Sequence, residues 1–189
     1  MVRYSAPMRS RQTFPPLGPS PWLVSDARND TVLEHSLRRL PRGSGLIFRH
    51  VHLAPAQRAR RFRALKALCR RHGHAIILAG TPRDARRLGA DGAYGPAHRL
   101  APHGPTLRLI TAHSLRELAA ANRARADLIL LSPAFPTRSH PGAPALGPLR
   151  FRLLAARAAA PVIALGGMNP RTARRLAPYG WAAIDGLSR

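Results

Sequence analysis

The 189-residue sequence is poor in cysteine, in acidic residues and in long apolar runs. Its single cysteine, Cys69, excludes an intrachain disulfide and a cysteine metal site, and it is expected to be a small buried apolar residue of a helix. No segment reaches the roughly 18 apolar residues that a membrane span needs, and the N-terminus lacks the apolar core of a secretory signal. We therefore expect a cytoplasmic protein with no membrane partner.

Lysine is equally scarce, because Lys66 is the only one. The chain has 31 lysine and arginine residues against 8 acidic ones, a net charge of +23. Such a charge attracts polyanions, but the arginines are spread over several predicted helices, and no zinc finger or RNA-binding aromatic motif accompanies them. This pattern disfavours specific nucleic-acid binding. It indicates a solvated basic exterior that also favours phosphorylated substrates.

Apolar runs and helical patterns alternate along most of the chain. Residues 1–20 are basic and proline-rich and are predicted to form a flexible arm, ahead of one domain over residues 21–189. The predicted strands are 22–25, 45–49, 75–79, 92–94, 107–111, 127–132, 162–165 and 181–184. The predicted helices are 31–40, 55–72, 82–88, 115–125, 148–159 and 170–177.

This alternation predicts a parallel sheet, and eight repeats predict a small closed (β/α)8 TIM barrel. Barrels of this kind typically run to about 250 residues. Here no helical pattern follows the eighth strand, so the last helix is expected to be missing. That side would be open, or covered by the arm or by a second copy of the chain in a homodimer. A doubly wound open sheet is the alternative architecture.

The segment 161–170, Pro-Val-Ile-Ala-Leu-Gly-Gly-Met-Asn-Pro, is the most informative one. It indicates a buried strand, a tight turn at Gly166-Gly167 and a helix start. Glycines let a ligand approach the backbone, and free amides at a helix start attract an anion. The loops after strands seven and eight frequently form the phosphate site of a TIM barrel. The pattern therefore predicts a phosphate-bearing ligand, with a plain strand-to-helix turn as the alternative.

Five segments, in order along the chain, match the motifs of one family. Residues 126–140 (ADLILLSPAFPTRSH) are similar to a hallmark of Ala-Asp-Tyr, apolar residues, Gly-Pro, Phe/Tyr-Pro-Thr and a lysine three residues later. Residues 162–170 resemble Val-x-Ala-Ile-Gly-Gly-Ile/Met, and residues 111–117 resemble Ser-x-His-Ser/Thr-x-x-Glu. Residues 89–92 and 46–49 give weaker matches, to Gly-Ala-Asp-Gly and to a Gln-x-Arg strand. The chain thus resembles the thiamine phosphate synthase and thiazole tautomerase family.

The resemblance implies a TIM-barrel enzyme of thiamin biosynthesis. In the synthase reaction an aminopyrimidine pyrophosphate loses pyrophosphate, and the pyrimidine carbocation is captured by the nitrogen of a thiazole phosphate. This chemistry needs Mg²⁺ and cations on the leaving group, together with a cradle for the thiazole phosphate. The sister tautomerase shares the barrel and the cradle. It moves only a proton on the thiazole phosphate, with a histidine of the strand-five motif and without a metal.

The resemblance also implies which residues form the site. The catalytic candidates are Arg49 and His113, and His113 matches the tautomerase base. Asp185 replaces a residue that is usually small, and it would either repel phosphate or cap a turn. Aspartate in place of Gly167 is expected to abolish phosphate binding while the fold stays largely intact. The substrate-binding candidates are Phe135, Pro136, Thr137, His140, Gly166, Gly167, Asp185 and Gly186.

The metal half of the site departs from the family. The third strand ends in Ala79-Gly80 where the synthase has Asn-Asp, and no acidic residue lies between Asp91 and Glu117, where the synthase has a metal-binding aspartate. Mg²⁺ is usually held by one or two carboxylates. We therefore expect no metal ligands in this chain, and Mg²⁺ as a cofactor only if synthase activity is retained. Three functions stay open: synthase-type transfer with a degraded magnesium–pyrophosphate site, metal-independent proton transfer by His113, or a non-catalytic anion- or nucleic-acid-binding barrel.

Overall fold

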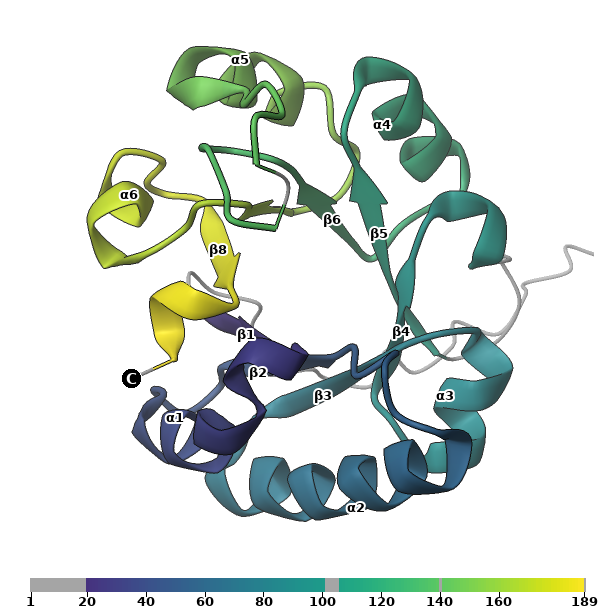
Figure 1. Ribbon diagram of the computed structural model, residues 1–189. Coiled ribbons are helices and arrows are strands. Elements are labelled where there is room, and N and C mark those ends of the chain that lie inside the picture. Colours follow the sequence, from purple (N-terminus) through teal and green to yellow (C-terminus); the bar gives the residue numbers. More distant parts are fainter. Residues whose placement is uncertain (1–19, 101–105, 140, 189) are drawn as a thin grey trace, which may run out of the picture.

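The computed structural model is a closed barrel of eight parallel strands surrounded by helices (Figure 1). It describes residues 20–100, 106–139 and 141–188, so the predicted arm lies outside the described residues except for its last residue. Each strand pairs with the next, and β8 (Gly180–Ala183) pairs back with β1 (Trp22–Val24). The predicted TIM barrel is confirmed, and the doubly wound open sheet is excluded.

The elements follow the predicted order closely. The remaining strands are β2 (Gly45–Phe48), β3 (Ala75–Ala79), β4 (Gly92–Gly95), β5 (Leu107–Ala112), β6 (Leu128–Leu131) and β7 (Val162–Leu165). The α-helices are α1 (Leu33–Arg39), α2 (Pro55–His72), α3 (Pro82–Leu88), α4 (Leu115–Arg123), α5 (Gly147–Ala155) and α6 (Pro170–Arg174). Short 3₁₀ helices are η1 (Ala27–Val32), η2 (Ala97–Arg99) and η3 (Asp185–Leu187). None of the described helices is long and apolar enough to cross a membrane.

The alternation of side chains along the strands divides the core into two layers. Val24 and Ile47 belong to the cluster that fills the barrel interior, whereas Leu23 and Phe48 belong to the cluster between the strands and the helices. Successive residues of a strand point to opposite faces of the sheet. Arg49, two positions after Ile47, is therefore aimed into the mouth of the barrel.

The seam between β8 and β1 is closed without an eighth α-helix. In the part of the chain that the structure describes, only η3 follows β8, and Figure 1 shows this C-terminal segment in yellow beside β1. Asn29 of the unpredicted helix η1 is 1% exposed, and its amide donates to the carbonyls of Val24 (3.0 Å) and Ile184 (3.3 Å) and to the Ser188 hydroxyl (3.0 Å). The buried Asn29 side chain thus links β1, the residue after β8 and Ser188 by hydrogen bonds.

Candidate functional site

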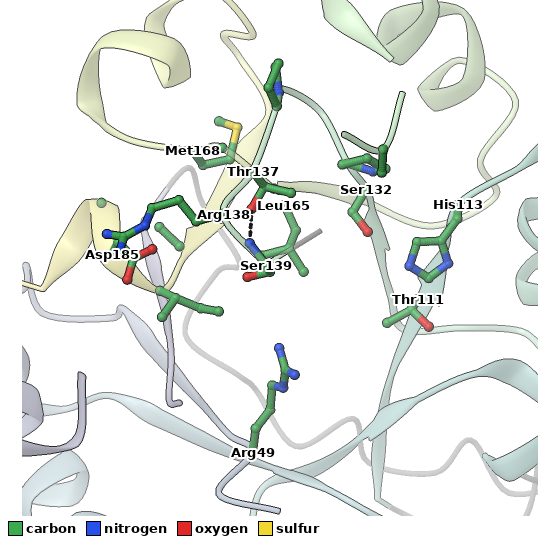
Figure 2. Close-up of a pocket in the computed structure, with 18 of the residues that line it drawn as sticks. Arg49, Thr111, His113, Ser132, Thr137, Arg138, Ser139, Leu165, Met168 and Asp185 are labelled. Carbon is green, nitrogen blue, oxygen red and sulfur yellow. Dashed lines mark hydrogen bonds between the residues drawn. The ribbon is translucent and has the colours of Figure 1, made fainter. Parts of the chain in front are cut away.

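A cavity of about 770 Å³ lies at the carboxyl ends of the strands. The segments that follow β2, β4, β5, β6, β7 and β8 all contribute to its lining. This is the end of a TIM barrel at which active sites are built. Figure 2 shows side chains from these segments converging on one open space, with Arg49 facing Thr137 and Ser139.

The cavity gathers most of the residues that the sequence singled out. Phe135 does not line it, because its ring is buried and packs under the Arg175 guanidinium at 5.2 Å, so it shapes the loop from behind. His140 lies outside the described residues. The predicted residues that line the cavity are Arg49, His113, Pro136, Thr137, Gly166, Gly167, Asp185 and Gly186.

The two glycines after β7 are required by the backbone itself. Gly166 and Gly167 have φ angles of +91° and +63°, a region that favours glycine. A Cβ atom on Gly166 would lie 2.8 Å from Cα of Pro133, and one on Gly167 would lie 2.4 Å from the carbonyl oxygen of Pro136. The segment after β6 therefore presses directly against the glycine turn, and the two segments form one wall of the cavity.

The start of α6 is not the anion site that the sequence suggested. Asn169 caps it, with its side-chain oxygen accepting the amides of Arg171 (2.9 Å) and Thr172 (3.0 Å), while the Thr172 hydroxyl accepts the amide of Asn169 (2.9 Å). The expectation of free amides at this helix start is wrong, because a capping box already uses them. By contrast, no described residue accepts the amides of Gly166 or Gly167. The glycine turn, rather than the helix, offers donors to an anion.

Asp185 is paired with Arg28, a residue that no sequence motif pointed to. Arg28 of η1 approaches the Asp185 carboxylate at 3.4 Å and the Asp26 carboxylate at 3.0 Å, and it donates to the Ser139 hydroxyl at 2.9 Å. These groups are part-exposed, so each pair adds little stability. Arg28 therefore offsets part of the Asp185 charge at the rim of the cavity, and whether Asp185 repels phosphate stays open. No sequence pattern links Arg28 to Asp185, since 157 positions separate them.

His113 is held by the glutamate of its own motif. Its Nδ1 lies 2.7 Å from Oε2 of Glu117, and its backbone amide donates to the same oxygen at 2.9 Å. Burial raises the pKa of Glu117, but the hydrogen bonds and charge of His113 outweigh it, so that pKa lies below its ordinary value. An ionised Glu117 can only accept, so the proton of a neutral imidazole is on Nδ1 and the lone pair is on Nε2. The arrangement suits a general base.

The side of the cavity that follows β2 carries a positive charge, that of Arg49. The Arg49 guanidinium points toward the centre of the cavity (Figure 2), and no described side chain forms a salt bridge with it. Tyr94 of β4, which is separated from β2 by β3, also lines the cavity. Burial raises the pKa of Tyr94, and the nearby charge of Arg49 only partly counteracts it. The phenol therefore stays protonated and can donate to a ligand beside Arg49.

The described lining of the cavity offers few carboxylates to a Mg²⁺ ion bound to pyrophosphate. Among the described residues that line the cavity, Asp185 is the only acidic one, and it faces Arg28. Within residues 20–100, 106–139 and 141–188 no group of three or more His, Cys, Asp or Glu side chains could hold a metal ion. The cations Arg49 and Arg138 line the cavity instead. This donor set does not fit Mg²⁺, which takes oxygen ligands.

The fold and the cavity define a TIM barrel with a glycine-walled, arginine-bearing site at its carboxyl end. Residues 22–188 match the family model described as thiamine monophosphate synthase, and the chain belongs to this family. A curated relative, the thiamine-phosphate synthase of Methanospirillum hungatei, is 29% identical over 113 residues, which are 56% of this chain and 55% of the relative. The chain therefore matches only about half the length of that relative.

Solved structures support the fold. A thiamine phosphate pyrophosphorylase from Pyrococcus furiosus superposes with a TM-score of 0.71 at 19% identity, covering 88% of this chain and 85% of the other. One from Bacteroides thetaiotaomicron gives a TM-score of 0.56 at 15% identity, covering 87% and 81%. An N-acetylmannosamine-6-phosphate 2-epimerase from Clostridium perfringens gives 0.59 at 12% identity, covering 98% and 94%. At these identities the likeness concerns the barrel and not the reaction.

Proposed function

We propose that this protein is an enzyme of thiamin biosynthesis that binds a thiazole phosphate in the cavity. The observation that carries the proposal is the pair of Gly166 and Gly167 amides, which lack acceptors in the described chain, at the wall of a cavity in a member of this family. Backbone amides in a left-handed turn form a concave donor site for anions. Thr137, whose hydroxyl accepts from the Ser139 amide at 3.3 Å, lies beside them and can donate to the same phosphate.

The first candidate reaction is the transfer that the family name describes. The C–O bond to the pyrophosphate breaks, the pyrophosphate leaves, and the thiazole nitrogen gives its lone pair to the pyrimidine carbocation. Arg49 is placed to neutralise the leaving group, and His140 is the second cation proposed for it. Because the described lining of the cavity holds one carboxylate, Asp185, and Arg28 pairs with it, we propose that this transfer is slow and gains little from Mg²⁺.

The second candidate reaction is proton transfer on the thiazole phosphate. It is favoured by the contact of 2.7 Å between His113 and Glu117, which leaves Nε2 of the imidazole as the basic atom in a cavity-lining residue. Such a reaction moves a proton from one ring position to another and needs neither a metal nor a leaving group. Histidine is the side chain that most often carries out such proton transfers.

Calorimetric titration with thiazole phosphate in the absence of metal tests the proposed function. We expect one site per chain, with the unphosphorylated thiazole binding far more weakly because it lacks the anion that the glycine amides contact. Equal affinity for both compounds would contradict the proposal. If thiazole phosphate does not bind, while an oligonucleotide binds with a steep loss of affinity in salt, the alternative of a non-catalytic anion- or nucleic-acid-binding barrel is favoured. The cytoplasmic location and the homodimer remain predictions.

Replacing Gly167 by alanine is expected to lower thiazole-phosphate affinity at least about tenfold. Its Cβ would lie 2.4 Å from the Pro136 carbonyl oxygen and 2.8 Å from Cβ of Phe135, so the segment after β6 must move away. An aspartate carries the same Cβ, so we expect it to lower stability as well, and that its fold stays largely intact remains a prediction. We expect the free energy of unfolding to fall by about 1–3 kcal/mol in urea denaturation.

Gly147→Ala is the matched control for this variant. Gly147 also has a positive φ, +67°, but its Cβ would meet no atom within 4 Å. The control therefore bears the backbone strain without the collision. We expect it to lose some stability and to keep its affinity. Equal affinity losses in both variants would show that the phosphate does not lie at the glycine turn.

A further inference from the structure

We propose that His50 is a positioning residue for Arg49 and acts through a hydrogen-bonded relay with Ser25 and Asp30. The relay lies behind the cavity wall, on the helix-facing side of the barrel. The inference rests on the proposed function, because it takes Arg49 as a ligand for the substrate anion. It adds three residues to the site that neither the sequence motifs nor the family match assigns.

The three residues form one continuous chain of contacts. Ser25 is fully buried, and its hydroxyl lies 2.7 Å from Nδ1 of His50. On the other side of the ring, Nε2 of His50 lies 2.8 Å from Oδ1 of Asp30. The Ser25 oxygen also accepts the backbone amide of Arg49 at 2.8 Å. The relay therefore ends on the peptide group from which the Arg49 side chain extends.

Only one arrangement of protons satisfies every member. Arg61 donates to Oδ1 of Asp30 at 2.8 Å. Burial raises the pKa of Asp30, but the hydrogen bonds and charges of His50 and Arg61 outweigh it and hold that pKa below its ordinary value. An ionised Asp30 accepts from Nε2, and burial lowers the pKa of His50, so its Nδ1 is free to accept the Ser25 proton. The Ser25 lone pair is then left for the Arg49 amide.

The backbone conformation of His50 explains why surrounding contacts are needed just after Arg49. His50 has a φ of +28°, which a residue with a side chain adopts only when surrounding contacts hold it. Its ring is 1% exposed and stacks on Phe48 with 4.7 Å between centroids and 4° between planes. The chain thus turns sharply just after Arg49, and that turn directs the two neighbouring side chains to opposite sides of the wall.

The backbone carbonyl group of Arg49 is also held by a hydrogen bond. Arg58 of α2 donates to the carbonyl oxygen of Arg49 at 3.1 Å and to that of Ala79 at 2.6 Å. With Ser25 on the amide and Arg58 on the carbonyl, the main chain of Arg49 is fixed on both sides. A long side chain that starts from a fixed backbone loses less freedom when it binds an anion, so the relay raises affinity through Arg49.

Titration with inorganic pyrophosphate tests the relay. We compare the full-length protein with Ser25→Ala, His50→Ala and His50→Asn, each with and without Arg49→Ala. Ser25→Ala and His50→Ala are expected to weaken binding about tenfold, the effect of losing one well-formed hydrogen bond. His50→Asn should recover most of the affinity, because asparagine tolerates a positive φ and its side-chain oxygen can accept from Ser25.

The double variants separate positioning from general damage. If Ser25 and His50 act through Arg49, Ser25→Ala causes no further loss once Arg49 is alanine. Equal losses in both backgrounds, or no recovery with His50→Asn, would overturn the relay. If His50→Ala does not fold, Ser25→Ala carries the test, since it leaves the stacked ring in place. Unchanged affinity in Arg49→Ala would overturn the proposed role of Arg49 on the pyrophosphate together with the relay, and the thiazole-phosphate site at the glycine turn would be untouched. A loss in Arg49→Ala without one in Ser25→Ala overturns the relay alone.

Discussion

Replacing His113 by alanine is expected to slow proton transfer on thiazole phosphate by about 100- to 10,000-fold, the usual contribution of a general base. The affinity for the ligand should change little, because we propose that the glycine turn after β7, and not His113, provides the phosphate contacts. The rate is measured by NMR as isotope exchange between the thiazole and deuterated water. The pKa of Glu117 is lowered, so this carboxylate stays ionised near neutral pH and keeps orienting the ring.

His98→Ala is the matched control for this experiment. His98 belongs to η2, is exposed and does not line the cavity, so its loss should leave the exchange rate unchanged. The exchange rate of Glu117→Gln should fall between those of His113→Ala and His98→Ala. The amide can still contact the imidazole ring, but it lacks the negative charge that favours the protonated form of His113. An unaltered rate in His113→Ala would remove proton transfer by this residue from consideration.

Removing metal is expected to change pyrophosphate affinity less than about twofold, whereas Arg49→Ala should lower it about 30-fold. The reason is the donor set of the cavity, which presents two arginines and a single carboxylate that faces Arg28. Binding is followed by calorimetry with EDTA and with added Mg²⁺, and product formation is followed with both substrates. We expect coupling to be slow or absent and not to be stimulated by Mg²⁺.

Arg99→Ala is the control for the loss of one positive charge. It lies on η2, is exposed and does not line the cavity. Both variants lower the net charge equally, so a difference between them reports the position of Arg49 rather than the general field of the protein. Rapid, Mg²⁺-dependent formation of thiamine phosphate by the purified protein would contradict the prediction. Asp26, Asp185 or the substrate's own oxygens would then complete a metal site.

The sequence by itself was enough to predict the barrel and many of the residues that line its cavity. Runs of alternating strand and helix patterns are local signals, and eight of them in order leave few architectures open. The position of a residue just after a strand also fixes the end of the barrel to which it belongs. For this reason Arg49, Thr137 and Gly166, far apart in the sequence, were predicted at one rim and all line one cavity.

Only the tertiary structure decided how those residues are used. The pairing of Arg28 with Asp185, the burial of the Phe135 ring and the relay behind Arg49 left no trace in composition or periodicity. Each depends on the direction of a side chain, which is set by packing between segments as far as 157 positions apart. Local patterns predict where the backbone goes, because backbone conformation is governed by near neighbours. The hydrogen-bond partners of these side chains come from distant segments, which meet only in the folded protein.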